Sequence, residues 1–454
     1  MMPITVDIMN DYNDAELDWQ TVDGYRKQFD QFLNRFSDCF ARTEGRKHLQ
    51  RYVNGQLSGL PRKNCEAIAD QAGIPPRTLQ DFLAIHTWDH ERATDTLQQI
   101  VAQEHHDPQS IGLIDETSFA KRGPHTACVQ RQYCGSTGKI DNCVVSVHLG
   151  YASHDSRFHC MLDGQLTLPE SWADDMPRCK NAGIPEDLFH RPKWKIALEL
   201  LGRAASNGVR FGWLTFDEGY GCCKQFLEAL QSRGQNYVAE VPKSFCGWAQ
   251  EPVVLQKEHY RQRKTGRPRR FPRLSAKSPR ACEVQNLLKY SSKMRELPWE
   301  NFHIKDTDKG PMVWKVKACR FRYQLAGNDR RPNIPLPSAP GWLLVAESQH
   351  TGEVKYFVSN APAGTPIETL IHVAFSRWQI ERLFQDDKSR LGMDQFECRG
   401  WVSIRRHLIL TAVSHSFLAK LGRQLESGGK KVCVAQPVVP SGGRVVSSAW
   451  GAAV

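Results

Sequence analysis

The stretch F-S-R-W-Q-I-E-R-L-F-Q-D-D-K-S-R-L-G, from Phe375 to Gly392, carries the pattern on which the prediction of the fold depends. Neither Gly nor Pro occurs before its last residue, so we expect one uninterrupted helix. At about 100° per residue, the apolar side chains form one stripe along this helix. The stripe consists of Ile380, Leu383, Phe384 and Leu391. A stripe of this kind indicates a helix that packs on a buried core.

An acidic side chain lies between two basic ones at the border of this stripe. On a helix, Arg377, Glu381 and Lys388 fall within about 40° of each other. The simpler interpretation is an i,i+4 ion pair between Arg377 and Glu381, which contributes a few tenths of a kcal/mol. The alternative is a functional site at the edge of the core, and the rest of the chain decides between the two.

The composition favours a polyanionic partner. The 454 residues include 60 Lys and Arg against 49 Asp and Glu, a formal net charge of +11. We expect no membrane span, because the most apolar run, Leu408–Leu421, contains His415 and Lys420. We also expect no signal sequence, because the first 19 residues are acidic and polar. The 14 cysteines form no C-x-x-C pair, so the sequence predicts a cytoplasmic protein with reduced thiols.

The N-terminal part is predicted to be a flexible leader, residues 1–20, followed by a helical domain, residues 21–105. Within it, Cys65–Ile85 predicts a helix ending at Gly73, a turn at Pro75-Pro76, and a second helix from about Arg77. This arrangement resembles a helix-turn-helix, which favours DNA binding. The alternative is a plain helical hairpin without contact to DNA.

From residue 106 the pattern changes to that of a mixed α/β sheet covered by helices. We assign residues 106–241 to the first part of this core. Its predicted strands end in acids at Asp115 and Asp217. The predicted strands are 111–114, 144–151, 158–168, 209–216 and 237–241, and the predicted helices are 193–206 and 222–232.

Residues 242–362 are predicted to be a β-rich insertion, with strands at 312–325, 342–347 and 354–359. Its basic segment, residues 257–280, holds ten Lys and Arg against one Glu. We expect Arg267, Arg269 and Arg270 to contact DNA phosphates, and the Gly-Arg-Pro core resembles a minor-groove AT-hook. The alternative is a solvated basic loop. Residues 363–421 return to the core as helices, and residues 422–454 are predicted to be a disordered tail.

Three acids stand out by position. Asp115 and Asp217 each follow a predicted strand of one sheet, and Glu381 lies on a helix that packs on that sheet. Three carboxylates around one point repel each other and therefore require cations. Two Mg²⁺ ions about 4 Å apart fit this requirement, because such a pair activates a nucleophile and stabilises the leaving oxygen of a phosphodiester.

Four segments of the chain resemble a DDE transposase of a bacterial insertion sequence, a family with an RNase H-like core. They are I-D-E-T-S-F-A-K-R-G (114–123), Q-Y-C-G-S-T-G-K-I-D-N-C (132–143), F-D-E-G-Y-G (216–221) and R-W-Q-I-E-R-L-F-Q-D-D-K (377–388). The last matches R-x3-E-x6-K of the family's Y-R-E-K signature, whereas the family's tyrosine is replaced by Ala374.

The resemblance implies catalytic and metal-binding roles for Asp115, Asp217 and Glu381. Asp115 would contact both Mg²⁺ ions and each other acid one, and Mn²⁺ would substitute for Mg²⁺. Arg377 and Lys388 would contact DNA, as would Lys121 and Arg122 after the first motif. The family also implies cut-and-paste transposition, with double-stranded DNA as partner: the terminal inverted repeats and the target DNA. It further implies a homodimer on DNA and a nucleoid-associated protein of the bacterial cytoplasm.

Two other functions remain open at this point. One is an RNase H-like nuclease that cleaves DNA without joining the ends. The other is a DNA-binding regulator that uses the helix-turn-helix and has an inactive core. Serine hydrolases and P-loop NTPases are not indicated, because neither G-x-S-x-G nor G-x-x-x-x-G-K-[ST] occurs.

Overall fold

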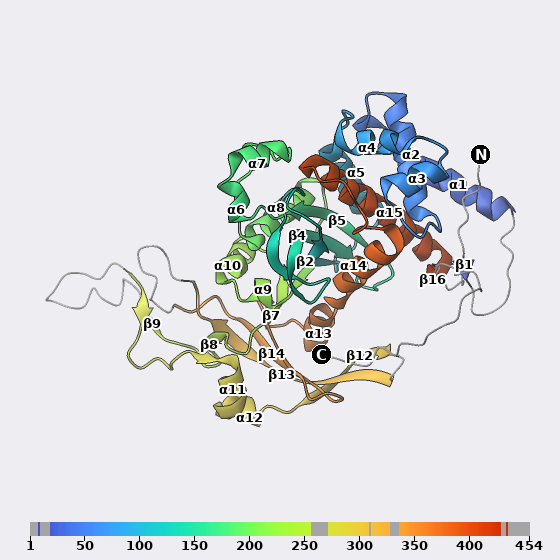
Figure 1. Ribbon diagram of the computed structural model, residues 1–454. Helices are drawn as coiled ribbons and strands as arrows, with labels where there is room; N and C mark the ends of the chain where they lie inside the picture. The colour runs from blue at the N-terminus through green and yellow to red at the C-terminus, as the bar shows by residue number, and fades with distance from the viewer. Residues whose placement is uncertain are drawn as a thin grey trace, which may run out of the picture.

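A large mixed sheet organises the protein, and helices cover both of its faces (Figure 1). The computed structural model describes residues 8–9, 19–255, 271–307, 310–326, 336–427 and 433–434. No helix in these ranges is long and apolar enough to cross a membrane.

The N-terminal domain is helical, as predicted. Its elements are α1 (Trp19–Asn34), η1 (Ser37–Cys39), α2 (Thr43–Leu57), α3 (Cys65–Gln71), α4 (Pro76–Ala84) and α5 (His90–Glu104). Helix α3 begins after Asn64, whose side chain accepts a hydrogen bond from the N–H of Ala67 at 2.9 Å. Gly73 follows with φ +64°, a left-handed conformation that glycine adopts without strain. The predicted helix, turn and second helix are therefore present, whereas their assignment as a DNA-binding helix-turn-helix remains a prediction.

The core sheet has the strand order β5–β4–β2–β6–β7. These strands are β2 (Ile111–Ala120), β4 (Lys139–Ala152), β5 (His159–Leu166), β6 (Trp213–Phe216) and β7 (Tyr237–Val241). Strand β4 is antiparallel to β2 and β5, whereas β2, β6 and β7 run parallel. A short strand, β3 (Gln130–Cys134), pairs with β4 in a hairpin. This arrangement confirms the predicted RNase H-like mixed sheet.

Helices cover the sheet on both sides. One face carries α8 (Lys193–Ser206) and α10 (Lys224–Ser232), whose apolar side chains join the buried cluster around Phe216. Shorter helices connect the strands: α6 (Glu170–Ala173), α7 (Met176–Asn181) and α9 (Glu218–Gly221). The other face carries α13 (Ile367–Phe375), α14 (Trp378–Leu391) and α15 (Trp401–Ser427), which continues past the predicted boundary at residue 421.

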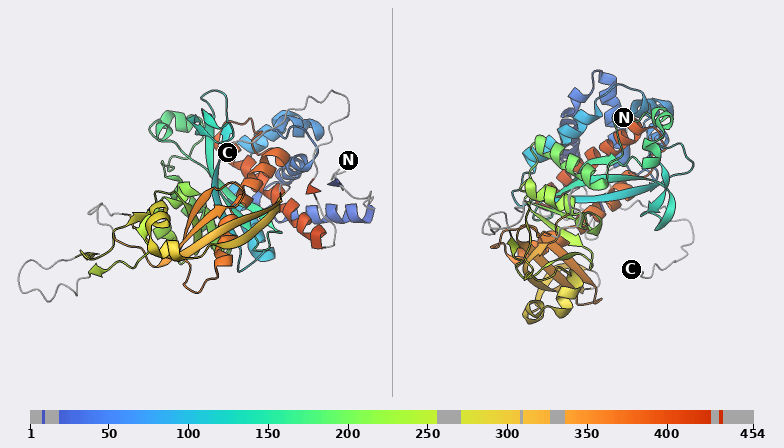
Figure 2. Two further views of the ribbon diagram at one scale, coloured as in Figure 1. Left: turned by 90° about the horizontal axis from the view of Figure 1, so that it is seen from below. Right: turned by 90° about the vertical axis from the view of Figure 1, so that its left-hand side faces the viewer.

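The insertion extends the core sheet instead of forming a separate one. Strand β15 (Val354–Ser359) pairs antiparallel with β7, and β14 (Gly341–Ser348), β13 (Gly310–Tyr323) and β12 (Glu300–Thr307) follow outward. Its smaller elements are β8 (Cys246–Trp248), β9 (Val254–Leu255), β10 (Arg273–Leu274), β11 (Cys282–Glu283), α11 (Val284–Tyr290) and α12 (Ser292–Glu296). Figure 1 and the right-hand view of Figure 2 show the insertion at the end of the molecule opposite the N-terminal helices. Two short strands, β1 (Ile8–Met9) and β16 (Cys433–Val434), pair with each other.

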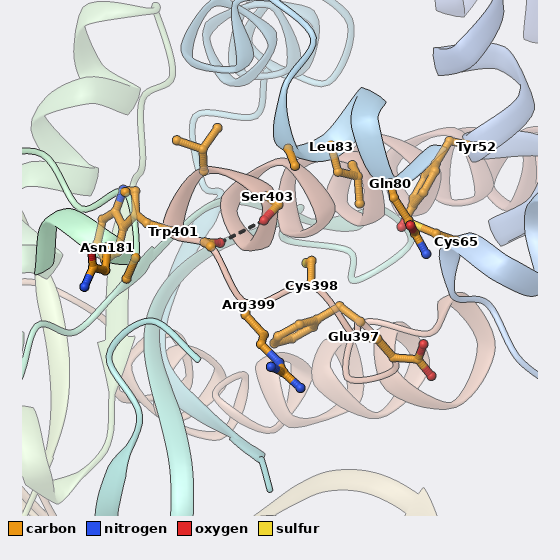
Figure 3. Close-up of a pocket in the computed structure, with 16 residues that line it drawn as sticks. Tyr52, Cys65, Gln80, Leu83, Asn181, Glu397, Cys398, Arg399, Trp401 and Ser403 are labelled. Carbon is orange, nitrogen blue, oxygen red and sulfur yellow. Dashed lines mark hydrogen bonds between the residues drawn. The ribbon is translucent and has the colours of Figure 1, made fainter. Parts of the chain in front are cut away.

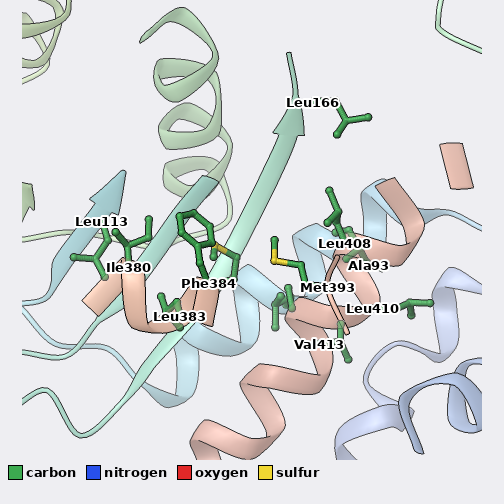
Figure 4. Packing of buried hydrophobic residues seen from close by; sticks show 14 of the residues in the cluster. Ala93, Leu113, Leu166, Ile380, Leu383, Phe384, Met393, Leu408, Leu410 and Val413 are labelled. Carbon is green, nitrogen blue, oxygen red and sulfur yellow. The ribbon is translucent and has the colours of Figure 1, made fainter. Parts of the chain in front are cut away.

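The apolar stripe of α14 is buried, as predicted. Ile380, Leu383 and Phe384 pack on the sheet near Leu113, and α15 packs behind them (Figure 4). Full burial of side chains of this size contributes about 1.5–3 kcal/mol each. The stripe therefore fixes the position of α14, and with it the polar residues along the border of the helix.

The prediction of one uninterrupted helix was wrong at its start. Helix α13 ends at Phe375, and α14 begins at Trp378. The Ser376 hydroxyl donates to the carbonyl of His372, and Gln379 N–H donates to the carbonyl of Ser376 at 3.0 Å. These local bonds tighten the backbone between the two helices. The C-terminal end at Gly392 is as predicted, with φ +73°.

Candidate active site

The two predicted aspartates lie side by side at the neighbouring parallel strands β2 and β6. Strands β2 and β6 pair so that Ile114 is opposite Phe216, and Asp115 and Asp217 are the next residues of the two strands. Adjacent strands are about 4.8 Å apart. Asp217 also begins helix α9, because its side chain accepts a hydrogen bond from Tyr220 N–H at 3.2 Å. The sheet register therefore brings together two acids that are 102 residues apart in sequence, 115 to 217.

Burial and mutual repulsion make this pair costly to charge. Burial, followed by the charge of Asp217, raises the pKa of Asp115 to about 7. Burial also raises the pKa of Asp217, although the N–H of Tyr220 opposes the shift. Two neighbouring carboxylates with raised pKa values are typical of a site that binds a cation or a proton.

Glu381 reaches the same site from α14, but only through an arginine. Its carboxylate accepts from Arg377 Nη2 at 2.7 Å, and its side chain is 58% exposed. Arg377 Nη1 lies 3.5 Å from Asp115 Oδ2. One guanidinium thus connects the glutamate of α14 with the first aspartate of the sheet, and Glu381 lies on the same side of the sheet as Asp115.

Arg377 has a third carboxylate partner. Its Nε lies 3.5 Å from Glu240 Oε2, on strand β7. Burial disfavours the guanidinium charge, but Glu381, Glu240 and Asp115 together outweigh that cost and raise the pKa of Arg377. The simple i,i+4 ion pair between Arg377 and Glu381 is therefore present, as one part of a larger cluster of charged side chains.

Glu116 and Glu218, the acids that follow the two predicted aspartates in sequence, lie outside the cluster around Arg377. Glu116 forms an ion pair with Lys193 of α8, on the opposite face of the sheet from α14. Glu218 is exposed in the first turn of α9. Side chains alternate between the two faces of a strand, which explains why Glu116 points away from Glu381.

The residues predicted to contact DNA differ in their surroundings. Lys388 lies 3.4 Å from the carbonyl of Ser118, and burial lowers its pKa. Lys121 donates to the carbonyl of Phe396 at 2.8 Å and lies over the Phe396 ring, and burial lowers its pKa to about 8. Arg122 is exposed. Lys121 and Lys388 thus both contact backbone carbonyls within the fold, whereas Arg122 lies at the surface.

The basic segment is only partly within the described residues. Arg267, Arg269 and Arg270 lie outside them, and so does most of residues 257–280. Their predicted contact with phosphate remains a prediction. The same holds for most of residues 422–454, of which only 422–427 and 433–434 belong to the described part.

The acids have the chemistry that Mg²⁺ requires, because all three offer carboxylate oxygens. The raised pKa values of Asp115 and Asp217 fit a place where a cation is needed. In the described part of the chain, however, no three His, Cys, Asp or Glu side chains are close enough to hold an ion. In this arrangement the guanidinium of Arg377 forms ion pairs with both Asp115 and Glu381.

Glu240 is the residue that sequence reasoning missed. Strands β6 and β7 pair with Phe216 opposite Ala239, so Asp217, directly after β6, and Glu240, within β7, follow this pair. The available signal was an acid in the strand predicted at 237–241, the third parallel strand. It was not recognised because the register between distant strands is not visible in the sequence.

A cavity of about 450 Å³ lies elsewhere, between the helical domain and the loop after α14 (Figure 3). Tyr52, Cys65 and Gln80 line it from one side and Glu397, Cys398 and Arg399 from the other. Neither predicted aspartate nor Glu381 lines this cavity. The carboxylate cluster is therefore a separate feature at the edge of the sheet.

Comparison with known proteins agrees with the sequence motifs. The probable transposase of the insertion sequence element IS701 from Microchaete diplosiphon is 30% identical over 190 residues. That match covers 41% of this chain and 46% of the relative, less than half of the relative's length. A piggyBac transposase, seen by cryo-electron microscopy in a synaptic complex with hairpin DNA, matches over 87% of this chain and 68% of its own. Its sequence identity is 11% and its TM-score 0.38.

A family described as DDE superfamily endonuclease matches residues 35–309. The match includes helices α2 to α5 of the helical domain, Asp115 and Asp217, whereas α1 lies before its start and Glu381 beyond its end. The predicted resemblance to a DDE transposase of an insertion sequence is thereby confirmed. Since the match spans more than half of the 454 residues, the chain belongs to the DDE superfamily endonuclease family.

Proposed function

We propose that the protein is a transposase that binds the ends of a mobile DNA element, cleaves phosphodiester bonds there, and joins the freed 3′-OH to target DNA. One observation carries the proposal. The register of parallel strands β2 and β6 brings Asp115 and Asp217 side by side, and Arg377 connects Glu381 to Asp115. Membership of the endonuclease family and the similarity to an insertion-sequence transposase support it.

Asp115, Asp217 and Glu381 would hold two divalent cations, Mg²⁺ or Mn²⁺. When bound, this pair activates the attacking oxygen and stabilises the departing oxygen of the phosphodiester. Asp115 and Asp217 would hold the cations from fixed positions, because Asp115 lies within β2 and Asp217 lies at the start of α9. Glu381, at 58% exposure, is the member of the set that solvent reaches most easily.

The basic residues near these acids would bind the DNA backbone. Arg377 and Lys388 lie on the same helix face as Glu381, and Arg122 lies at the surface after β2. Phosphate contacts position the duplex without reading its sequence. Sequence recognition of the element ends would come from the helix-turn-helix of α3 and α4. Segment 257–280, with Arg267, Arg269 and Arg270, would add phosphate contacts.

Transposition requires two element ends, so we propose a homodimer on DNA. Double-stranded terminal repeats and target DNA would be the partners, and the bacterial nucleoid the place of action. The net charge of +11 supports a DNA-bound protein.

The proposal is tested with purified protein and a supercoiled plasmid that carries the gene with its natural flanking DNA. With Mg²⁺, we expect cleavage at the two flanks and, in longer reactions, joined products with the 3′ ends in new positions. Chelation of the metal should stop both steps without preventing DNA binding. Cleavage without joined products would favour a nuclease, and binding without cleavage a DNA-binding regulator; either result would contradict the proposal.

A further inference from the structure

A fourth carboxylate belongs to the row of acids at the centre of the site. Ile114 is opposite Phe216, and Phe216 is opposite Ala239. The residues that follow them are Asp115 within β2, Asp217 directly after β6, and Glu240 within β7. Residues in the same register of parallel strands present their side chains to the same face. Glu240 is therefore placed beside the two predicted catalytic aspartates by the sheet itself.

The surroundings of Glu240 are those of an anchored carboxylate. Its side chain is 10% exposed, and a buried carboxylate is costly unless cations accompany it. Two cations do so: Lys355 Nζ at 2.8 Å and Arg377 Nε at 3.5 Å. Lys355 comes from β15, the strand that joins the insertion to the core. The insertion thus contributes a charged residue to the catalytic end of the sheet.

Arg377 has a planar guanidinium whose donors point in fixed directions. When Nε faces Glu240, the two Nη atoms face Asp115 and Glu381, at 3.5 Å and 2.7 Å. Glu240 therefore supplies one of the three contacts that fix the orientation of the guanidinium. Without it, the side chain would be restrained by Asp115 and by the exposed carboxylate of Glu381 alone.

We propose that Glu240, supported by Lys355, is a positioning residue that holds Arg377 in the orientation that keeps Glu381 next to Asp115. This inference rests on the proposed function, because it assigns a purpose to the assembly of the same three acids. Arg377 acts as an internal cation among the carboxylates, and it keeps the exposed glutamate near the sheet before DNA and divalent ions bind.

A coupling experiment tests the inference. Glu240→Gln removes the charge and keeps the shape, and it is made both in the natural chain and in an Arg377→Ala background. Two quantities are measured: Mn²⁺ affinity by calorimetry without DNA, and the rate of plasmid cleavage. Glu347→Gln is the matched control, since Glu347 forms a cross-strand ion pair with Lys315 at 2.8 Å in the same sheet, away from the site.

In the natural chain, Glu240→Gln should weaken Mn²⁺ affinity and cleavage by about 10-fold, the lower end of the range for residues that orient metal ligands. In the Arg377→Ala background the same substitution should change Mn²⁺ affinity and cleavage rate by less than about 2-fold, because the arginine that Glu240 positions is absent. Glu347→Gln should leave both unchanged. Equal losses in the two backgrounds, or no loss in the natural chain, would overturn the inference.

Lys355→Gln gives a second, independent perturbation if Glu240→Gln fails to fold. It should cause a smaller loss in the same direction, again only when Arg377 is present. A natural chain that binds Mn²⁺ but cleaves no DNA would contradict the proposed function and leave the coupling in Mn²⁺ affinity as the test of positioning. The two failures are therefore distinguishable.

Discussion

Gly221 ends the F-D-E-G-Y-G segment, and replacing it with alanine should damage the site through the backbone. A Cβ added at Gly221 would lie 1.8 Å from the carbonyl oxygen of Glu240 and 3.0 Å from its carbonyl carbon. Both are backbone atoms of β7, so a change of side-chain rotamer cannot relieve the overlap. Relief to 3.0 Å from the oxygen requires a movement of 3.0 − 1.8 = 1.2 Å between α9 and β7.

That movement separates groups that the site requires in register. Gly221 N–H donates to the carbonyl of Asp217 at 2.8 Å, so a shift of α9 carries Asp217 with it. Overpacking of this kind costs about 1–3 kcal/mol of stability. Misplacement of a catalytic group by about 1 Å costs on the order of 100-fold in rate. We therefore expect Gly221→Ala to lower both the free energy of unfolding and the cleavage rate.

The assays are urea unfolding and plasmid cleavage, with Gly202→Ala as the matched control. Gly202 lies inside α8, and nothing lies within 4 Å of a Cβ added there. Alanine at this position should stabilise the protein by about 0.5–1 kcal/mol and leave cleavage unchanged. If Gly221→Ala retained natural stability and cleavage, the close approach of α9 to β7 would be refuted.

Three further predictions concern the core, the pH dependence and the basic segment. Leu383→Ala removes a fully buried side chain of α14 and should cost about 2–5 kcal/mol in urea unfolding, with slower cleavage because Glu381 shares the helix. Burial, followed by the charge of Lys121, lowers the pKa of His407 from 6.5 to about 4. The native state therefore binds fewer protons than the unfolded state between these values, and stability should fall as the pH drops below 6.5. From His407 alone the decrease at pH 5 is about 2 kcal/mol, and His407→Gln should flatten this part of the pH profile in urea titrations. Replacing Arg267, Arg269 and Arg270 by Gln should reduce the slope of log affinity against log salt by about 0.9 for each DNA phosphate that is no longer neutralised. An unchanged slope in DNA titrations would place these residues away from DNA.

Local patterns predicted several elements to the residue. Strands 237–241 and 354–359 and helix 193–206 agree with β7, β15 and α8, because each has a strong pattern between clear breaks. The acids Asp115 and Asp217 were found for the same reason, since each follows a buried apolar run.

What depends on long-range pairing could not be predicted. The joining of the insertion to β7 and the place of Glu240 both follow from strand register, which the sequence does not display. The break before Trp378 comes from hydrogen bonds around Ser376 that no periodicity indicates. The role of Arg377 as the connection between Asp115 and Glu381 likewise required the geometry.

The most direct test of the central claim compares two adjacent carboxylates. Asp217 is part of the acid row, whereas Glu218 is exposed in α9. Asp217→Asn should abolish Mg²⁺-dependent plasmid cleavage while DNA affinity stays within about 2-fold, because it removes a metal ligand and leaves the DNA-binding elements in place. Glu218→Gln should retain cleavage and binding. Undiminished cleavage by Asp217→Asn, or equal impairment of both variants, would contradict the assignment of the active site.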